Sequence, residues 1–122
     1  MKRVEQAIEH IAENISGKAV LEVACGCAEF SLAAAQTAKS VDGIDLDYLR
    51  LPPSARKTEG FKFTVMDATN MAFPEGSFDA AVMYNAIGHL GAVLEKVLKE
   101  CLRVTKPGGA IFVISSFRID MP

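Results

Sequence analysis

Short apolar runs alternate with amphipathic stretches along most of the chain. Runs that stay apolar almost throughout are typical of strands buried on both faces of a sheet. Such runs predict strands over residues 19–24, 40–45, 61–66, 78–84 and 110–116. Apolar residues at helical spacing predict helices over residues 4–15, 30–38 and 90–104.

Glycine and proline divide these elements. Pro52 and Pro53 must break or start any helix in the connection over residues 46–60, and Pro107-Gly108-Gly109 is expected to end the last helix. Strands that alternate with helical connections indicate an α/β fold with a doubly wound parallel sheet. The length of 122 residues fits one domain, 1–122, with an N-terminal helix (1–15) and a core (16–117).

The charge pattern narrows the classes of partner. The formal net charge is −2 and the basic residues form no block, so neither non-specific nucleic-acid binding nor binding to an anionic membrane is expected. No apolar run approaches the roughly 20 residues that cross a bilayer. The first ten residues are charged and amphipathic, which favours a cytoplasmic protein.

Cys25, Cys27 and Cys101 are the three cysteines of the chain. Their odd number and the C-x-C spacing of the first two argue against a disulfide framework or a four-ligand zinc site. We therefore expect reduced, mostly buried thiols and no metal site.

Small and acidic residues follow the predicted strands at their carboxyl ends, where open parallel sheets bind ligands. The first strand carries Glu22 and leads into Gly26, and the next three end at Asp45, Asp67 and Asn85. Small residues allow a ligand to approach the backbone closely, and the helix that follows the first strand is expected to aim free N–H groups at a ligand carboxylate. A carboxylate at Asp45 suits two ribose hydroxyls, one at Asp67 suits the exocyclic amine of a purine, and Glu22 can balance an ammonium group.

Together these segments resemble the motifs of class I S-adenosylmethionine-dependent methyltransferases. The matching segments are VLEVACGCAE, VDGIDLD, VMDATNMAFPEGSFDAAV and LKECLRVTKPGGAIFVI, in the family's order and spacing. The resemblance covers roughly residues 16–117 and is closest to the small-molecule type that includes quinone-biosynthesis enzymes. It implies a Rossmann-like sheet of strand order 3-2-1-4-5, with S-adenosylmethionine as cofactor and S-adenosylhomocysteine as product.

The resemblance also assigns residues to parts of the cofactor. It implies that the methionine end is lined by Glu22, Ala24, Gly26 and Asn85. Asp45 would bind the ribose. The adenine would lie against Leu46, Asp67 and Ala68.

Three departures from the family pattern bear on these assignments. Ala24 and Ala28 replace two of the glycines that the first motif usually has, and alanine restricts positive φ. The double proline weakens the helix after the second strand. The family usually continues after the fifth strand with a helix and an antiparallel addition, which we expect to be missing from a sequence that ends at residue 122. We expect the long apolar edge strand 110–116 to pair with another copy or a partner chain, or to be covered by the tail.

Methyl transfer to a small-molecule acceptor is the activity that the resemblance implies, by direct displacement on an oriented acceptor. His89 lies near the expected rim as a candidate base, with a rim or helix-capping histidine as the alternative. Tyr84 either touches the methionine end or packs. The rival function is a module that binds the cofactor or its product without transferring methyl. A nicotinamide-dependent dehydrogenase is disfavoured because G-x-G-x-x-G is absent, and an N6-adenine DNA methyltransferase because Ala-Ile follows Asn85.

Overall fold

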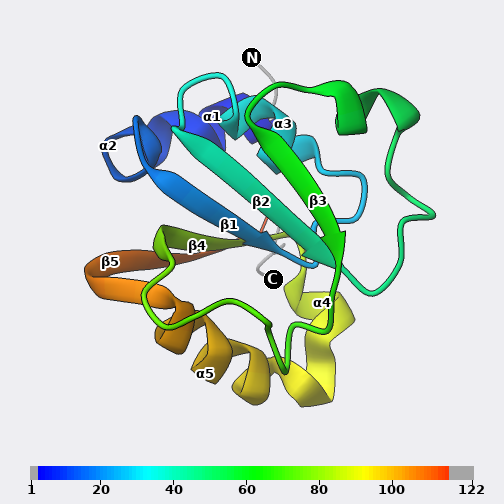
Figure 1. Cartoon of the computed structure of the whole chain (residues 1–122), viewed down its shortest axis with the longest axis vertical. Helices are drawn as coiled ribbons and strands as arrows, with labels where there is room; N and C mark the ends of the chain where they lie inside the picture. Colours follow the sequence, from blue (N-terminus) through cyan, green and yellow to red (C-terminus); the bar gives the residue numbers. More distant parts are fainter. Residues whose placement is uncertain (1–2, 116–122) are drawn as a thin grey trace, which may run out of the picture.

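A five-stranded parallel sheet forms the middle layer of the molecule (Figure 1). The computed structural model describes residues 3–115. The strands are β1 (Ala19–Val23), β2 (Ser40–Asp45), β3 (Phe61–Val65), β4 (Phe78–Tyr84) and β5 (Thr105–Ile114). They lie in the order β3-β2-β1-β4-β5 and every neighbouring pair is parallel, which confirms the predicted fold class and strand order.

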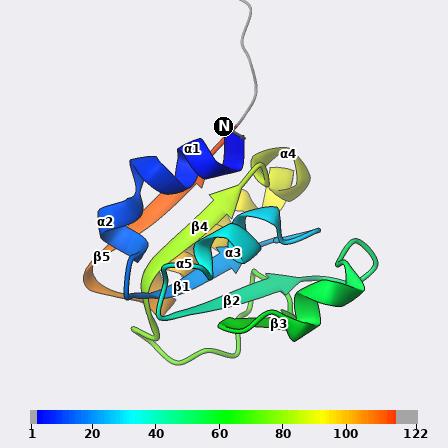
Figure 2. The same ribbon diagram turned by 90° about the horizontal axis from the view of Figure 1, so that it is seen from above.

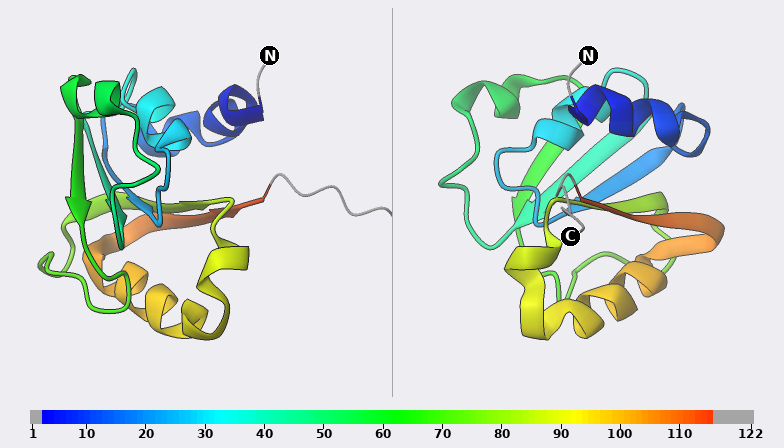
Figure 3. Two further views of the ribbon diagram at one scale, coloured as in Figure 1. Left: turned by 90° about the vertical axis from the view of Figure 1, so that its right-hand side faces the viewer. Right: turned by 180° about the vertical axis from the view of Figure 1, so that it is seen from behind.

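Helices cover both faces of this sheet (Figures 2 and 3). One face carries α1 (Arg3–His10), α2 (Ala12–Ile15), α3 (Glu29–Ala34) and the 3₁₀ helix η1 (Pro53–Lys57). The other face carries α4 (Ile87–Leu90), the 3₁₀ helix η2 (Gly91–Val93) and α5 (Leu94–Val104). None of the helices in residues 3–115 has the length and apolar character needed to span a membrane.

Successive residues of the central strands enter two separate cores. Val20 and Val82 pack on the side of α1 and α3, whereas Leu21 and Met83 pack on the side of α5. All four side chains are fully buried. Since a strand points alternate side chains to opposite faces, burial of both faces explains the continuous apolar runs in the sequence.

Three predicted helices are shorter or more broken than the apolar periodicity indicated. The helix predicted over 4–15 is interrupted at Ile11, where φ is −116° and ψ is 15°. The helix predicted over 30–38 ends at Ala34. The helix predicted over 90–104 is divided by Gly91, whose φ of 40° is incompatible with a helix. The apolar stripe continues across each break because the chain beyond it still covers the same core.

The predicted end of the last helix at residue 104 is confirmed, but residues 106–109 lie inside β5, so the last strand begins at Thr105 and not at residue 110 as predicted. Helix α5 stops at Val104, and Thr105 is already extended (φ −93°, ψ 135°). The pairing of β5 with β4 shifts register between Phe78 and Ala80. A Cβ at Gly109 would stand 2.6 Å from the Asp79 carbonyl oxygen, so only glycine fits this irregularity. Within the described residues β5 pairs with β4 alone; residue 116 of the predicted strand lies outside them.

Candidate functional site

The loop between β1 and α3 has the backbone shape that the missing glycines would favour. Ala24, Gly26 and Ala28 all have positive φ, of 55°, 55° and 62°. For residues other than glycine this conformation costs roughly 1–2 kcal/mol. The two alanines therefore keep the loop geometry of a glycine-rich motif and hold strain in doing so.

Asp45, the last residue of β2, joins this loop to the next one. Its Oδ2 accepts a hydrogen bond from the Gly26 backbone N–H at 2.8 Å, and its Oδ1 accepts one from Leu46 at 2.7 Å. Each carboxylate oxygen can accept a second hydrogen bond. The carboxylate is thus held by two backbone groups and retains acceptor capacity for hydroxyl groups of a ligand.

Glu22 in β1 is a buried carboxyl with only 1% of its surface exposed. Its Oε1 accepts hydrogen bonds from the Ser31 backbone N–H (3.1 Å) and the Ser31 hydroxyl (2.6 Å). Burial raises the pKa of Glu22 to about 8, although the hydrogen bonds from Ser31 oppose the rise. The Ser31 N–H is thus directed at Glu22 and not at a ligand, and the expectation that other N–H groups at the start of α3 face a ligand stays a prediction.

The loop after β3 is exposed and is ordered partly by its own side chains. Asp67 Oδ1 accepts hydrogen bonds from the Thr69 backbone N–H (2.8 Å) and hydroxyl (2.7 Å). These hydrogen bonds hold the pKa of Asp67 below its usual value. An ionised carboxylate consequently stands at the carboxyl end of β3, as the sequence predicted.

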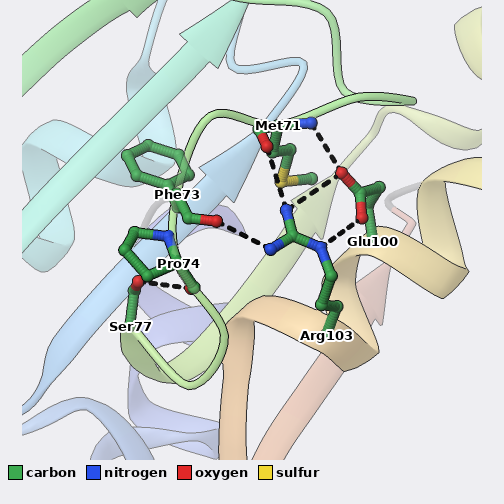
Figure 4. A network of polar contacts seen from close by, with 6 residues as sticks. All are labelled: Met71, Phe73, Pro74, Ser77, Glu100 and Arg103. Atoms are coloured by element: carbon green, nitrogen blue, oxygen red, sulfur yellow. Dashed lines mark hydrogen bonds and ion pairs between the residues drawn. The ribbon is translucent and has the colours of Figure 1, made fainter.

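A polar network on α5 holds the same loop from outside (Figure 4). The Arg103 guanidinium donates to the carbonyl oxygens of Phe73 (2.8 Å) and Met71 (2.9 Å), and also to Glu100. Glu100 in turn accepts the Met71 backbone N–H at 2.6 Å. Sequence reasoning missed this pair, for which the only available signal was an i, i+3 acid–base spacing on a predicted helix.

Two adjoining cavities lie where these loops meet. The larger, of about 180 Å³, is bordered by residues that include Ala24, Asp45, Leu46, Asp67, Ala68 and His89. The smaller, of about 110 Å³, is bordered by residues that include Glu22, Ala24, Gly26, Tyr84, Asn85 and His89. Every site residue predicted from the sequence borders at least one of them. Their separate roles in binding stay predictions.

Residues at the junction of the cavities come from the loops after β1 and β2 and from α4, which follows β4. Ala24, Arg50 and His89 border both cavities, and the sequence analysis had not singled out Arg50. His89 lies exposed in α4. Tyr84 borders the smaller cavity and also packs against Phe30, with ring centroids 5.8 Å apart, so both of its predicted roles are compatible with its position.

Larger hollows elsewhere lack this chemistry. A groove of about 630 Å³ lies between α1 and α3, and another of about 540 Å³ lies beside α5. Neither contains a residue predicted from the strand ends. We therefore place the candidate site at the smaller cavities, where open parallel sheets bind ligands.

Residues 3–115 contain no group of three or more potential metal-binding side chains.

Comparison with known proteins agrees with the geometry. A family described as methyltransferase domain matches residues 21–113. Demethylmenaquinone methyltransferase from Paenarthrobacter aurescens (strain TC1) is 35% identical over 101 residues, covering 83% of this chain and 39% of that protein. Phthiotriol/phenolphthiotriol dimycocerosates methyltransferase from Mycobacterium leprae (strain TN) is 34% identical over 100 residues, covering 79% and 37%.

Solved structures are similar as well. The crystal structure of a SAM-dependent methyltransferase from Methanosarcina mazei has a TM-score of 0.68 and 30% identity to this chain, covering 85% of this chain and 55% of that one. The chain spans about two fifths of the length of the curated relatives it matches.

Proposed function

Because the chain belongs to the family of methyltransferase domains, we propose that it binds S-adenosylmethionine and takes part in methyl transfer to a small-molecule acceptor. S-adenosylmethionine is the cofactor of this family. The observation that carries the proposal is the hydrogen bond from the Gly26 N–H to Asp45. It sets a carboxylate suited to ribose hydroxyls directly beside a backbone loop nearly free of side chains.

The two cavities suit the two ends of this cofactor. The larger would take adenosine, with Asp45 at the ribose and Leu46, Asp67 and Ala68 at the adenine. Leu46 supports an adenine contact because 71% of its surface is exposed and unused by the core. The smaller would take the methionine group, beside Glu22, Gly26 and Asn85.

The acceptor would lie near α4, which borders both cavities, and η2, which borders the larger one. When bound, the cofactor supplies a methyl group activated by its sulfonium. The chain's own task is then orientation, which can supply ~7–11 kcal/mol of the barrier. Val93, which borders the larger cavity, and Ile87, at the start of α4, expose apolar surface, which favours an apolar acceptor such as a quinone precursor. His89, between them, is the proposed base for an acceptor that must lose a proton.

Calorimetry with S-adenosylmethionine and S-adenosylhomocysteine tests the proposal. Asp45→Ala should weaken both ligands by at least about ten-fold, because each lost charge-assisted hydrogen bond is worth ~1.5–3 kcal/mol. Asp47→Ala is the matched control, since Asp47 is exposed and, among residues 3–115, accepts a hydrogen bond from Leu49 alone. The proposal fails if the unaltered chain binds neither ligand. Binding with no turnover on any of a panel of acceptors would favour the rival, non-catalytic module.

The family assignment does not determine the partners of the chain or its location in the cell. We propose that a second copy or a partner chain pairs with the open edge of β5, where Val113 is 45% exposed. A monomer in dilute solution with fast amide exchange over residues 110–115 would contradict this. A cytoplasmic location and the lack of a nucleic-acid partner stay predictions from the charge pattern.

A further inference from the structure

Arg50 lies in the candidate site without a partner of its own. Among residues 3–115 no hydrogen bond or ion pair to its side chain is present. The guanidinium instead lies across the bare face of Gly26: a Cβ built on that glycine would stand 2.9 Å from Nη1 and 3.0 Å from Cζ. Arg50 thus reaches from the loop after β2 onto the loop after β1.

The side chains around Arg50 in the candidate site are mostly acidic among those that carry charge. The smaller cavity is bordered by Glu22 and Glu29, and the larger by Asp45 and Asp67. Among the described residues that border either cavity, Arg50 is the only lysine or arginine. An anionic group placed there would lie among Glu29, Asp45 and Asp67, and pairing with this guanidinium would offset their repulsion.

The methionine group of the proposed cofactor brings one ammonium and one carboxylate to this place. The acidic residues can accept the ammonium. The start of α3 offers less to the carboxylate, because the Ser31 N–H already donates to Glu22. A guanidinium binds a carboxylate through two parallel hydrogen bonds. Arg50 therefore suits the methionine carboxylate, which the acidic residues cannot bind.

We propose that Arg50 binds the carboxylate of the cofactor's methionine group and holds it over Gly26. The assignment rests on the proposed function. It gives Gly26 a second role, because a side chain at this position would push the guanidinium from its place as well as strain the backbone at φ 55°. It also makes Arg50 a determinant of specificity for ligands that carry the carboxylate.

Calorimetry with two ligands tests this assignment on the full chain. S-adenosylhomocysteine is compared with its decarboxylated analogue, in which hydrogen replaces the carboxylate. The unaltered chain should prefer the carboxylated ligand by about ten-fold, and Arg50→Gln should bring the ratio close to one by weakening that ligand alone. Arg50→Lys should keep part of the preference, because it keeps the charge but loses the two-pronged geometry.

Arg56→Gln is the matched control for this experiment. Arg56 lies in the same connection, over the ring of Tyr48 at 5.4 Å, and borders neither cavity. It should leave both affinities unchanged. The assignment is overturned if Arg50→Gln weakens both ligands equally, or if it strengthens both because the arginine merely obstructs the site. Failure of the unaltered chain to bind either ligand would instead count against the proposed function.

Discussion

The loop after β1 and the loop after β3 both border the larger cavity, but the first is held from inside the core and the second from the surface. Buried Glu22 and half-buried Asp45 hold the first loop, through Ser31 and Gly26. The second relies on exposed Asp67 and on the Arg103 network of α5.

Because of this difference, the two halves of the site should be disturbed by different changes. A buried carboxyl responds to pH, because ionisation in a poorly solvated place is costly. A strained backbone responds to the choice between alanine and glycine. The surface network responds to deletion of a single long side chain. The methionine half and the adenine half should therefore fail under different changes.

The largest effect is expected for Glu22→Gln. Since the pKa of Glu22 is raised from 4.5 to about 8, the stabilisation from its neutral form is complete below pH 4.5 and is lost as pH rises towards 8. The glutamine variant cannot ionise, so above pH 8 it should be more stable by several kcal/mol, on the order of 1.4 kcal/mol for each pH unit that separates the folded and unfolded pKa values. Urea unfolding at pH 5, 7 and 9 measures this, with Glu13→Gln on the exposed surface of α2 as the control. Parallel pH profiles for Glu22→Gln and the unaltered chain would contradict it.

A smaller effect, confined to the adenine half, is expected for Arg103→Met. Without the guanidinium the carbonyls of Met71 and Phe73 lose their donor, so amide exchange over residues 69–73 should accelerate. Affinity for S-adenosylhomocysteine should fall by about ten-fold, although Arg103 does not border the proposed cofactor cavities. Lys99→Met is the control, since within the described part of the chain Lys99 pairs with Glu95 alone, on the exposed face of α5. Equal affinities in the two variants would show that the loop holds its shape without the network.

The smallest effect is expected for the two strained alanines. Ala24→Gly should relieve ~1–2 kcal/mol of strain and lose ~0.5–1 kcal/mol to the entropy of the unfolded chain, a net gain of about 0.5 kcal/mol. Ala28→Gly should gain nothing, because Ala28 is fully buried and its methyl group contributes a further ~0.8 kcal/mol. Urea denaturation compares the variants. A loss of stability in Ala24→Gly would mean that the alanine packs better than its geometry indicates.

Strand positions could be predicted because burial on both faces leaves a continuous apolar run, as at β1 and β4, whereas the strand order was predicted from the family resemblance. Helix breaks could not, because an apolar stripe passes through Ile11 and Gly91 without a change of period. The start of β5 at Thr105 could not be predicted for a related reason. Proline and glycine usually end a helix, but here they allow an irregular strand to pass close to Asp79.

Site residues could be predicted where the backbone itself carries them to the strand ends, as with Asp45 and Asp67. Arg50 and Arg103 were missed because long side chains act at a distance that sequence spacing does not encode. Arg103 reaches carbonyl groups 30 and 32 residues away along the chain. Only the folded arrangement brings those groups together.

Cys25 and Cys27 stand two residues apart on the loop after β1, and only Cys27 is exposed. Burial raises the pKa of the Cys25 thiol, so this sulfur should resist alkylation until the loop opens. Cys27 borders the smaller cavity and should react with iodoacetamide unless a bound molecule shields it. Alkylation of Cys27 should therefore report whether the smaller cavity is occupied, and alkylation of Cys25 should report whether the loop opens. Mass spectrometry can measure both on the chain without any substitution.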